Sequence, residues 1–153
     1  GDVYKRQTYD NYRIIAGYQY VNDNVGLNIR FHVGGSESTA NYSYENAALT
    51  SSTYNYDALG ATTMQIGAAS GNATGETGTL VFDLTNANST TIATRIHGFQ
   101  YSVNANGNSV GYAFQAGYDS QNNAYADVVN GLRFYMGAGN IIMRHFTLYG
   151  MIK

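Results

Sequence analysis

The sequence predicts an all-β protein, an antiparallel two-sheet β-sandwich of jelly-roll-like type, built from about eight to ten short strands. Three observations predict this class. Tyrosine, which favours strands, occurs 15 times. The 18 glycines, together with many asparagines, supply residues for tight turns. Only 12% of the residues are charged, whereas long solvated helices usually carry many Glu and Lys side chains.

The length of 153 residues fits a single domain with its own core. We place that domain at residues 9–153. Residues 1–8 begin with GDVYKRQ, which contains a higher share of charged residues than the rest of the chain, where such residues are sparse. They are interpreted as a non-native segment, similar to translated sequencing-adapter read-through, or as a basic linker, and in both cases they are expected to lie outside the fold.

The first strands are expected at residues 11–20 and 26–35. In the first, Tyr12 and Ile14 share one face. The second is the clearest strand of the chain, because apolar and polar residues alternate along it. The apolar set is Leu27, Ile29, Phe31 and Val33, and the polar set is Asn28, Arg30 and His32. Gly34 and Gly35 form the turn that follows.

The middle of the chain, residues 36–60, is expected to hold two strands joined by an irregular segment. ANYSY and STYNYDALG alternate tyrosines with small polar residues, and ENAAL between them is expected to form one helical turn. Met64 and Ile66 then share one face of a short apolar segment.

Three strands follow between residues 77 and 118. Leu80, Phe82 and Leu84 share the inner face of the first. The pattern of the second places His97, Phe99, Tyr101 and Val103 on one face and Ile96, Gly98 and Gln100 on the other, with the aromatic face expected to be the more buried. The turn NANGN leads to the third strand, in which Val110, Tyr112 and Phe114 are in phase.

The last two strands are expected on either side of the turn GAGN at residues 137–140. Leu132, Phe134 and Met136 are the apolar face of the first. In the closing strand Phe146 and Leu148 point inward, and His145, Thr147 and Tyr149 point outward. Arg144 and His145 are therefore expected to be surface or subunit contacts.

The composition excludes several classes of function. The chain has no cysteine, so it holds no disulfide or thiolate metal site. A formal net charge of −2 gives no electrostatic basis for binding nucleic acid or an acidic membrane. No apolar stretch approaches the roughly 18 residues that cross a bilayer. We expect no cofactor and no metal, since the polar turns at residues 22–24 and 119–127 do not match a calcium-binding loop.

Catalytic motifs are also lacking in the sequence. His32 and His145 fall on the polar faces of their strands, where a solvent-facing or interface role is expected, and His97 is expected to be partly buried. No nucleophile elbow or zinc-binding histidine pair accompanies them. The carboxylates are scattered, mostly in turns, so a glycan hydrolase is the weakest of the functions considered.

The tyrosines in polar segments are the more informative residues. Exposed aromatic side chains stack on sugars or fill protein interfaces, and they also pack at strand edges with no further role. All three interpretations stay open for this set. The candidate interface or glycan contacts are Tyr42, Tyr44, Tyr54, Tyr56 and Tyr125, together with Arg144 and His145.

The order of motifs resembles a known group of proteins. YDNYRI, RFHVGGSESTANYSY, TGTLVFDL, GLRFYMGAGNI and the terminal FTLYGMIK occur in this order. They are similar to the C-terminal jelly-roll domain of virion structural proteins of tailed phages, of tail-fibre or head-appendage type, which are common in marine metagenomes. The match covers residues 9–153 and rests on structural positions, among them Tyr9, Tyr12, Phe134, Asn140 and Tyr149.

The resemblance implies a non-enzymatic virion component, located on the particle surface, that acts in assembly and host-surface attachment. Such domains often form trimers, so a homotrimer that contacts other virion proteins is expected. The alternative function is a carbohydrate-binding β-sandwich module that contacts host-surface glycan. Exposed aromatic residues lining a groove would favour the alternative.

Overall fold

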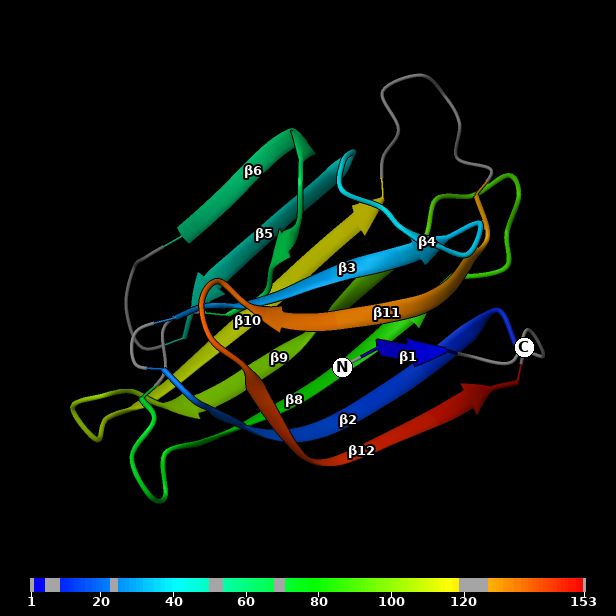
Figure 1. Ribbon diagram of the computed structural model, residues 1–153. Helices are drawn as coiled ribbons and strands as arrows, with labels where there is room; N and C mark the ends of the chain where they lie inside the picture. The colour runs from blue at the N-terminus through cyan, green and yellow to red at the C-terminus, as the bar shows by residue number, and fades with distance from the viewer. Residues whose placement is uncertain are drawn as a thin grey trace.

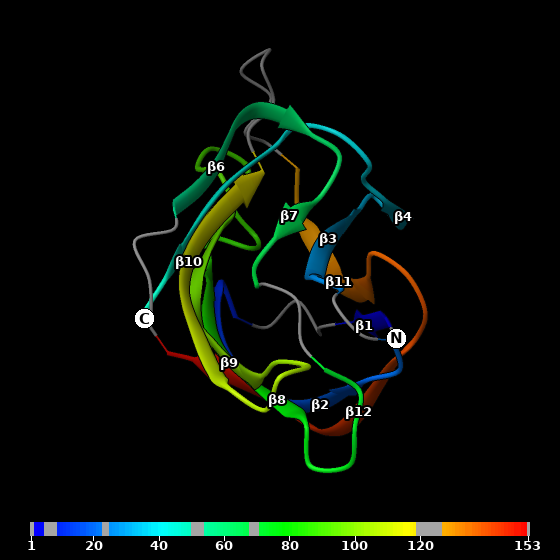
Figure 2. The ribbon, with the colours of Figure 1, turned by 90° about the vertical axis from the view of Figure 1, so that its left-hand side faces the viewer.

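The chain folds into two antiparallel sheets packed face to face (Figures 1 and 2). The computed structural model describes residues 2–4, 9–22, 25–49, 54–67, 71–118 and 127–152. For the strands at 2–4 and 54–59 the description covers the backbone alone. The two-sheet β-sandwich predicted from the sequence is confirmed.

The larger sheet has seven strands, and in Figure 2 it curves around the smaller sheet, so that its outer face is convex. Every neighbouring pair in it is antiparallel. From edge to edge the strands are β12 (Ile141–Met151), β2 (Asn11–Tyr20), β8 (Thr77–Thr85), β9 (Arg95–Val103), β10 (Ser109–Tyr118), β5 (Tyr42–Ala48) and β6 (Tyr54–Ala61).

The smaller sheet has five strands, three of which are very short. Its path is β1 (Asp2–Tyr4), β11 (Val129–Met136), β3 (Leu27–Val33) and β4 (Ser36–Glu37), and β7 (Met64–Gln65) pairs with β3 beside this path. Without β1, β4 and β7, which span two or three residues each, the described residues hold nine strands, within the predicted number. Gly34 and Gly35, with φ of 59° and 85°, make the turn expected between β3 and β4.

The jelly-roll order is not confirmed. A jelly roll consists of two Greek keys spread over two sheets. Here the consecutive strands β8, β9 and β10 are neighbours in a single sheet. Residues 45–48 of the expected helical turn are instead part of β5.

The core between the sheets contains the apolar faces predicted for most strands. Ile14, Leu80 and Phe82 of the large sheet and Ile29 and Phe134 of the small sheet are almost fully buried, as expected. Phenylalanine rings join the layers: the Phe82 centroid lies 6.1 Å from those of Phe114 and Phe134, and Phe134 lies 5.9 Å from Phe146. Phe146 and Leu148 face inward as predicted, but they are only partly buried at the sheet edge.

The face prediction for β9 is wrong. Ile96, Gln100 and Ser102 are buried, whereas Phe99 and Tyr101 are 61% and 52% exposed. His97, expected to be partly buried, is exposed as well. The aromatic face of β9 therefore lies on the outer surface of the large sheet.

A buried polar cluster explains why β9 turns the face with Gln100 and Ser102 inward. Tyr18 is fully buried, and its hydroxyl accepts hydrogen bonds from Gln100 Nε2 at 2.8 Å and from the Tyr20 hydroxyl at 3.2 Å. Burial raises the pKa of Tyr18 well above its usual value, so its hydroxyl stays protonated. A hydroxyl in the core needs a polar partner, and the amide of Gln100 supplies it.

Two further expectations are corrected. His32, expected on an exposed or interface face, is only 7% exposed, and it lies in register with Gly131 of β11 and Glu37 of β4. Residues 1–8 were expected to lie outside the fold, but Asp2–Tyr4 pair with β11 as strand β1.

Candidate functional site

The outer face of the large sheet carries a polar row that crosses five strands. Arg13, Asp83, His97, Gln115 and Glu45 lie in register from β2 through β8, β9 and β10 to β5. Directly paired residues of an antiparallel sheet project on the same face, with Cβ atoms about 4.5–5.5 Å apart. Residues far apart in the sequence therefore form one continuous polar line.

Two strong contacts fix the ends of this polar row. The Arg13 guanidinium donates to both carboxylate oxygens of Asp83, at 2.7 and 2.8 Å. At the other end Gln115 Nε2 donates to Glu45 Oε2 at 2.6 Å. His97 lies between them, with Nε2 3.8 Å from Asp83 Oδ2. The hydrogen bond from Arg13 lowers the pKa of Asp83, so this carboxyl group is ionised at neutral pH.

An apolar row runs parallel to the polar row across the sheet, and on each strand the two rows are two residues apart. Val81, Phe99, Ala113 and Ala47 are in register across β8, β9, β10 and β5. Phe99 is the one large aromatic side chain of these four. Tyr101 continues the exposed aromatic surface of β9, and its hydroxyl donates to Ser109 Oγ at 2.6 Å.

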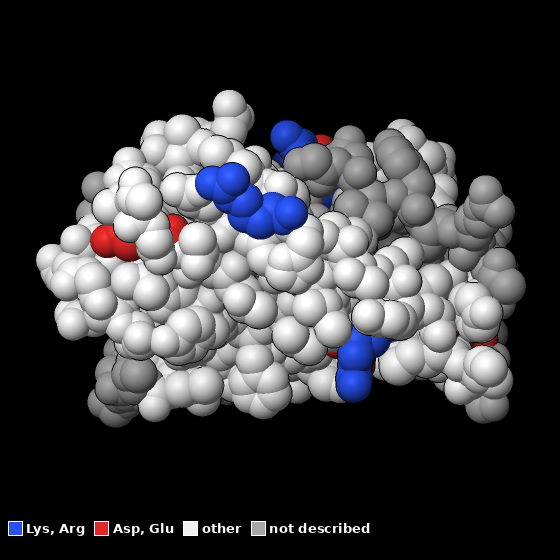
Figure 3. Space-filling view, turned by 90° about the horizontal axis from the view of Figure 1, so that it is seen from below, with Lys and Arg blue, Asp and Glu red and all other residues white. Residues whose placement is uncertain are grey.

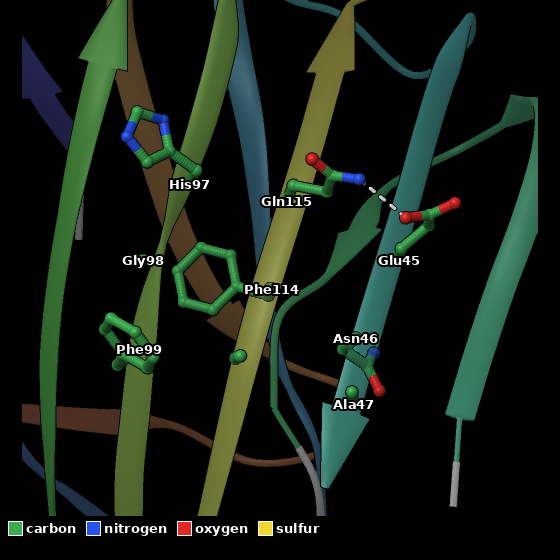
Figure 4. A pocket seen from close by; sticks show the side chains of 9 residues that line it. Glu45, Asn46, Ala47, His97, Gly98, Phe99, Phe114 and Gln115 are labelled. Carbon is green, nitrogen blue, oxygen red and sulfur yellow. Dashed lines mark hydrogen bonds between the residues drawn. The ribbon is translucent and has the colours of Figure 1, made fainter. Parts of the chain in front are cut away.

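A hollow of about 330 Å³ lies where the two rows meet over β9, β10 and β5. Figure 4 shows His97 and Phe99 on one side of it and the hydrogen-bonded pair Gln115–Glu45 on the other. The small side chains of Ala113 and Ala47 leave the space between them open. The complete lining is Glu45, Asn46, Ala47, His97, Gly98, Phe99, Ala113, Phe114 and Gln115.

Among the described residues, the two carboxylates of the polar row are too far apart for the usual glycosidase arrangement. Paired glycosidase carboxyl groups stand about 5–9.5 Å apart. Asp83 and Glu45 are separated by three strand spacings, which corresponds to about 14 Å. Within the described residues no three His, Asp or Glu side chains come together as a metal site.

The edge strand β12 holds two of the predicted contact residues, Arg144 and His145. Both are exposed, as expected. Arg144 Nη2 donates to Gln19 Oε1 of the neighbouring strand. The His145 ring lies over Gly17, where an added Cβ would come within 2.5 Å of the imidazole. Both side chains thus lie against β2, apart from the hollow.

The predicted tyrosine contacts separate into two groups. Tyr42 is fully buried, and its hydroxyl accepts from the Phe31 backbone N–H at 2.8 Å and donates to the Ser38 carbonyl at 3.0 Å. It is a core residue, so its assignment as an exposed contact is wrong. Tyr44 is partly buried and packs against the same core.

The other predicted tyrosines lie outside the described part. Tyr54 and Tyr56 belong to β6, whose backbone pairs them with Ala47 and Glu45, but their side chains are outside the described residues. Tyr125 falls in the segment 119–126, which is also outside them. Whether these three residues contact a partner stays a prediction.

A second charged cluster lies on the smaller sheet. Arg30 Nη1 contacts Glu37 Oε1 at 2.6 Å, and Arg133 Nη1 contacts the other carboxylate oxygen of Glu37. The two guanidinium groups stand 4.9 and 5.2 Å from the ring centroid of Tyr135. Burial raises the pKa of Glu37, but the hydrogen bonds from Arg30 and Arg133 outweigh it, and the net effect lowers that pKa. This cluster fastens the short strand β4 to β3 and β11.

The sequence interpretation missed the hollow because it placed Phe99 and His97 on the wrong face. A signal for the correct face was present. Arg95, a charged residue expected at the surface, has the same strand parity as His97, Phe99 and Tyr101. The structure exposes Arg95 together with them.

Comparison with known proteins identifies no relative of this chain. No family model, curated protein or solved structure matches this chain. In the described part of the chain no helix is long and apolar enough to cross a membrane.

Proposed function

We propose that the protein is a non-enzymatic structural component of a virion, of tail-fibre, head-fibre or capsid-decoration type, which assembles with further copies of itself at the particle surface. The order of motifs from Tyr9 to Gly150 supports the virion assignment. The observation that carries self-assembly is β12, an edge strand of 11 residues.

The outer edge of β12 has the properties of a pairing surface. No strand among the described residues pairs with this edge. Proteins usually block long edge strands with lysine, proline or a bulge, because the unpaired backbone groups recruit other strands. β12 contains no lysine and no proline, and its one bulge lies between Met143 and His145. Residues 146–151 are left as a regular edge.

The occupant that suits this edge is β12 of a second copy. Two antiparallel copies related by a two-fold axis present the same groups to each other, which makes the contact self-complementary. A pairing centred on Thr147 would place His145 opposite Tyr149 of the other copy. The strand carries no carboxylate, and its one arginine, Arg144, lies away from the centre.

The surface near this edge is suited to association. Ile142 and Tyr149 of β12 are 43% and 52% exposed. Viewed from below, charged side chains are few and separated by wide uncharged areas (Figure 3). Low charge density with exposed aromatic residues is characteristic of the central part of protein interfaces.

Light scattering at several concentrations tests the proposal. We expect a particle that persists on dilution, with twice the 16.6 kDa mass of one chain if β12 pairs about a two-fold axis. The trimer implied by the resemblance remains a prediction, and the measured mass decides between two and three copies. A monomer at every concentration would contradict self-assembly.

Matched lysine variants locate the contact. Ile142→Lys combined with Tyr149→Lys adds two charges to the edge strand and should yield monomers. Ile92→Lys makes the same isoleucine change at an exposed position between β8 and β9, and should leave the mass unchanged. Circular dichroism confirms that each variant is folded. Equal masses for the wild type and the β12 variant would assign assembly to another surface.

A further inference from the structure

We propose that the hollow beside Phe99 binds one ring of a neutral glycan, with Phe99 as the stacking surface and the Glu45–Gln115 pair as the hydrogen-bonding rim. The site lies on β9, β10 and β5. Self-assembly is proposed at β12, with β2 and β8 between that edge and β9. The glycan site is thus a separate surface, and it adds a ligand to the assembly function.

The size of the hollow suits a small ring. At about 330 Å³ it falls at the lower end of the roughly 300–1,000 Å³ typical of small-molecule sites. Its polar and apolar rows are two residues apart along the strands, or about 6.6 Å, which is the scale of one six-membered sugar ring. Ala113 and Ala47 keep the centre open.

The apolar side matches one face of a pyranose. Phe99 is 61% exposed although it belongs to a regular strand. The face of an aromatic ring carries partial negative charge and attracts polarised C–H groups. A pyranose offers such C–H groups on its faces and hydroxyl groups around its edge. A ring stacked on Phe99 would therefore direct hydroxyl groups toward the polar row.

The polar side is arranged in advance for hydroxyl groups. The hydrogen bond of 2.6 Å from Gln115 Nε2 to Glu45 Oε2 holds both side chains at the rim. Beyond that bond, a carboxylate offers several acceptor sites, and a glutamine amide offers an acceptor oxygen and a second N–H. Sugar hydroxyl groups both donate and accept, so they match this mixture. His97, whose side chain is 59% exposed, adds a third polar group.

The charge around the hollow selects a neutral ligand. Arg13 neutralises Asp83 through the two contacts of 2.7 and 2.8 Å. Among the described residues that line the hollow, Glu45 has a neutral hydrogen-bond partner, the Gln115 amide, and it brings a negative charge to the rim. A carboxylated or sulfated sugar would meet repulsion there, because like charges interact unfavourably at close range.

Nuclear magnetic resonance titration of the full chain tests this site. The probes are neutral hexasaccharides of glucose, xylose, mannose and galactose, with hexagalacturonate as the anionic probe. We expect saturable shifts for at least one neutral probe, concentrated on the amides of Ala47, Phe99, Ala113 and Gln115, and none for hexagalacturonate. Each hexasaccharide is titrated per chain, so the result does not depend on the oligomeric state.

Two variants make the test specific. Phe99→Ala should weaken binding at least about tenfold and leave the remaining amide spectrum folded, because Phe99 is mostly exposed. Ile92→Ala removes a comparably exposed apolar side chain between β8 and β9, away from the hollow and from β12, and should bind as the wild type does. The proposal is overturned by any of three results: no saturable shift with any neutral probe, preference for hexagalacturonate, or undiminished binding by Phe99→Ala. None of these would affect the light-scattering test of assembly.

Discussion

Replacement of Gly98 by alanine should destabilise the protein strongly for a single added methyl group. An added Cβ at this position in β9 would lie 2.2 Å from the Val81 carbonyl oxygen and 2.5 Å from Phe82 Cβ. These atoms belong to the β8 backbone or are attached directly to it, so they cannot rotate away. Overpacking of this kind costs about 1–3 kcal/mol. The gain of about 0.4–1 kcal/mol from a less flexible unfolded chain offsets only part of it.

Gly111→Ala is the matched control on the adjacent strand β10. There the nearest atom to an added Cβ is Leu49 Cδ1 at 3.3 Å, the end of a flexible and exposed side chain. We therefore expect Gly111→Ala to be neutral or slightly stabilising. Urea unfolding followed by tyrosine fluorescence measures both variants. Equal unfolding midpoints for the two variants would refute the argument that the β8–β9 spacing excludes a side chain at Gly98.

Four further variants test the core and the polar row. Leu80→Ala, in the centre of the core, should lower the free energy of unfolding by about 2–5 kcal/mol. Leu148→Ala, at a half-buried position on β12, should lower it by about 1–2 kcal/mol. Calorimetry compares the two variants, and equal losses would contradict the edge position of β12. Tyr42→Phe leaves the Phe31 N–H without its acceptor and should cost about 1–3 kcal/mol in urea unfolding; an unchanged midpoint would show that this hydrogen bond is dispensable. The hydrogen bond with Arg13 lowers the pKa of Asp83, so the stability that Asp83 contributes to the folded state is complete above the unfolded-state pKa of about 4 and is lost as the pH falls through the lowered pKa. Asp83→Asn should therefore remove about 1 kcal/mol or less of the pH-dependent free energy of unfolding in acid. An identical pH profile of stability for variant and wild type would count against the ion pair.

The sandwich was predictable because most strands alternate cleanly. In β3, β8 and β11 the apolar residues recur at every second position, and a strand places such residues on one face. The turns were equally clear, since Gly34 and Gly35 both adopt positive φ. The sheet order was not predictable, because hydrophobic alternation specifies which face is buried and carries no information about neighbouring strands.

The candidate site was predicted poorly, for a physical reason that concerns both sides of β9. Hydrophobicity alone favours burying Phe99 and Tyr101. The core opposite β9 contains the Tyr18 hydroxyl, and this group favours Gln100 as its partner. Such a requirement arises from contacts between residues 82 positions apart, which periodicity within one strand cannot reveal. Tyr42 was misplaced similarly, because its partners Phe31 and Ser38 lie on neighbouring segments.

The inverted orientation of β9 is itself an argument that its outer face has a function. Exposing a large aromatic side chain forgoes about 1.5–3 kcal/mol of burial. On the inner face Ser102 Oγ and Gln100 Oε1 are buried with no hydrogen-bond partner among the described residues, which adds a further cost. A strand selected for stability alone would carry Phe99 and Tyr101 inside and polar residues outside. Departures from local consistency of this kind are expected at functional sites. The same strand borders the hollow, so this cost supports the proposed ligand site on the exposed aromatic surface.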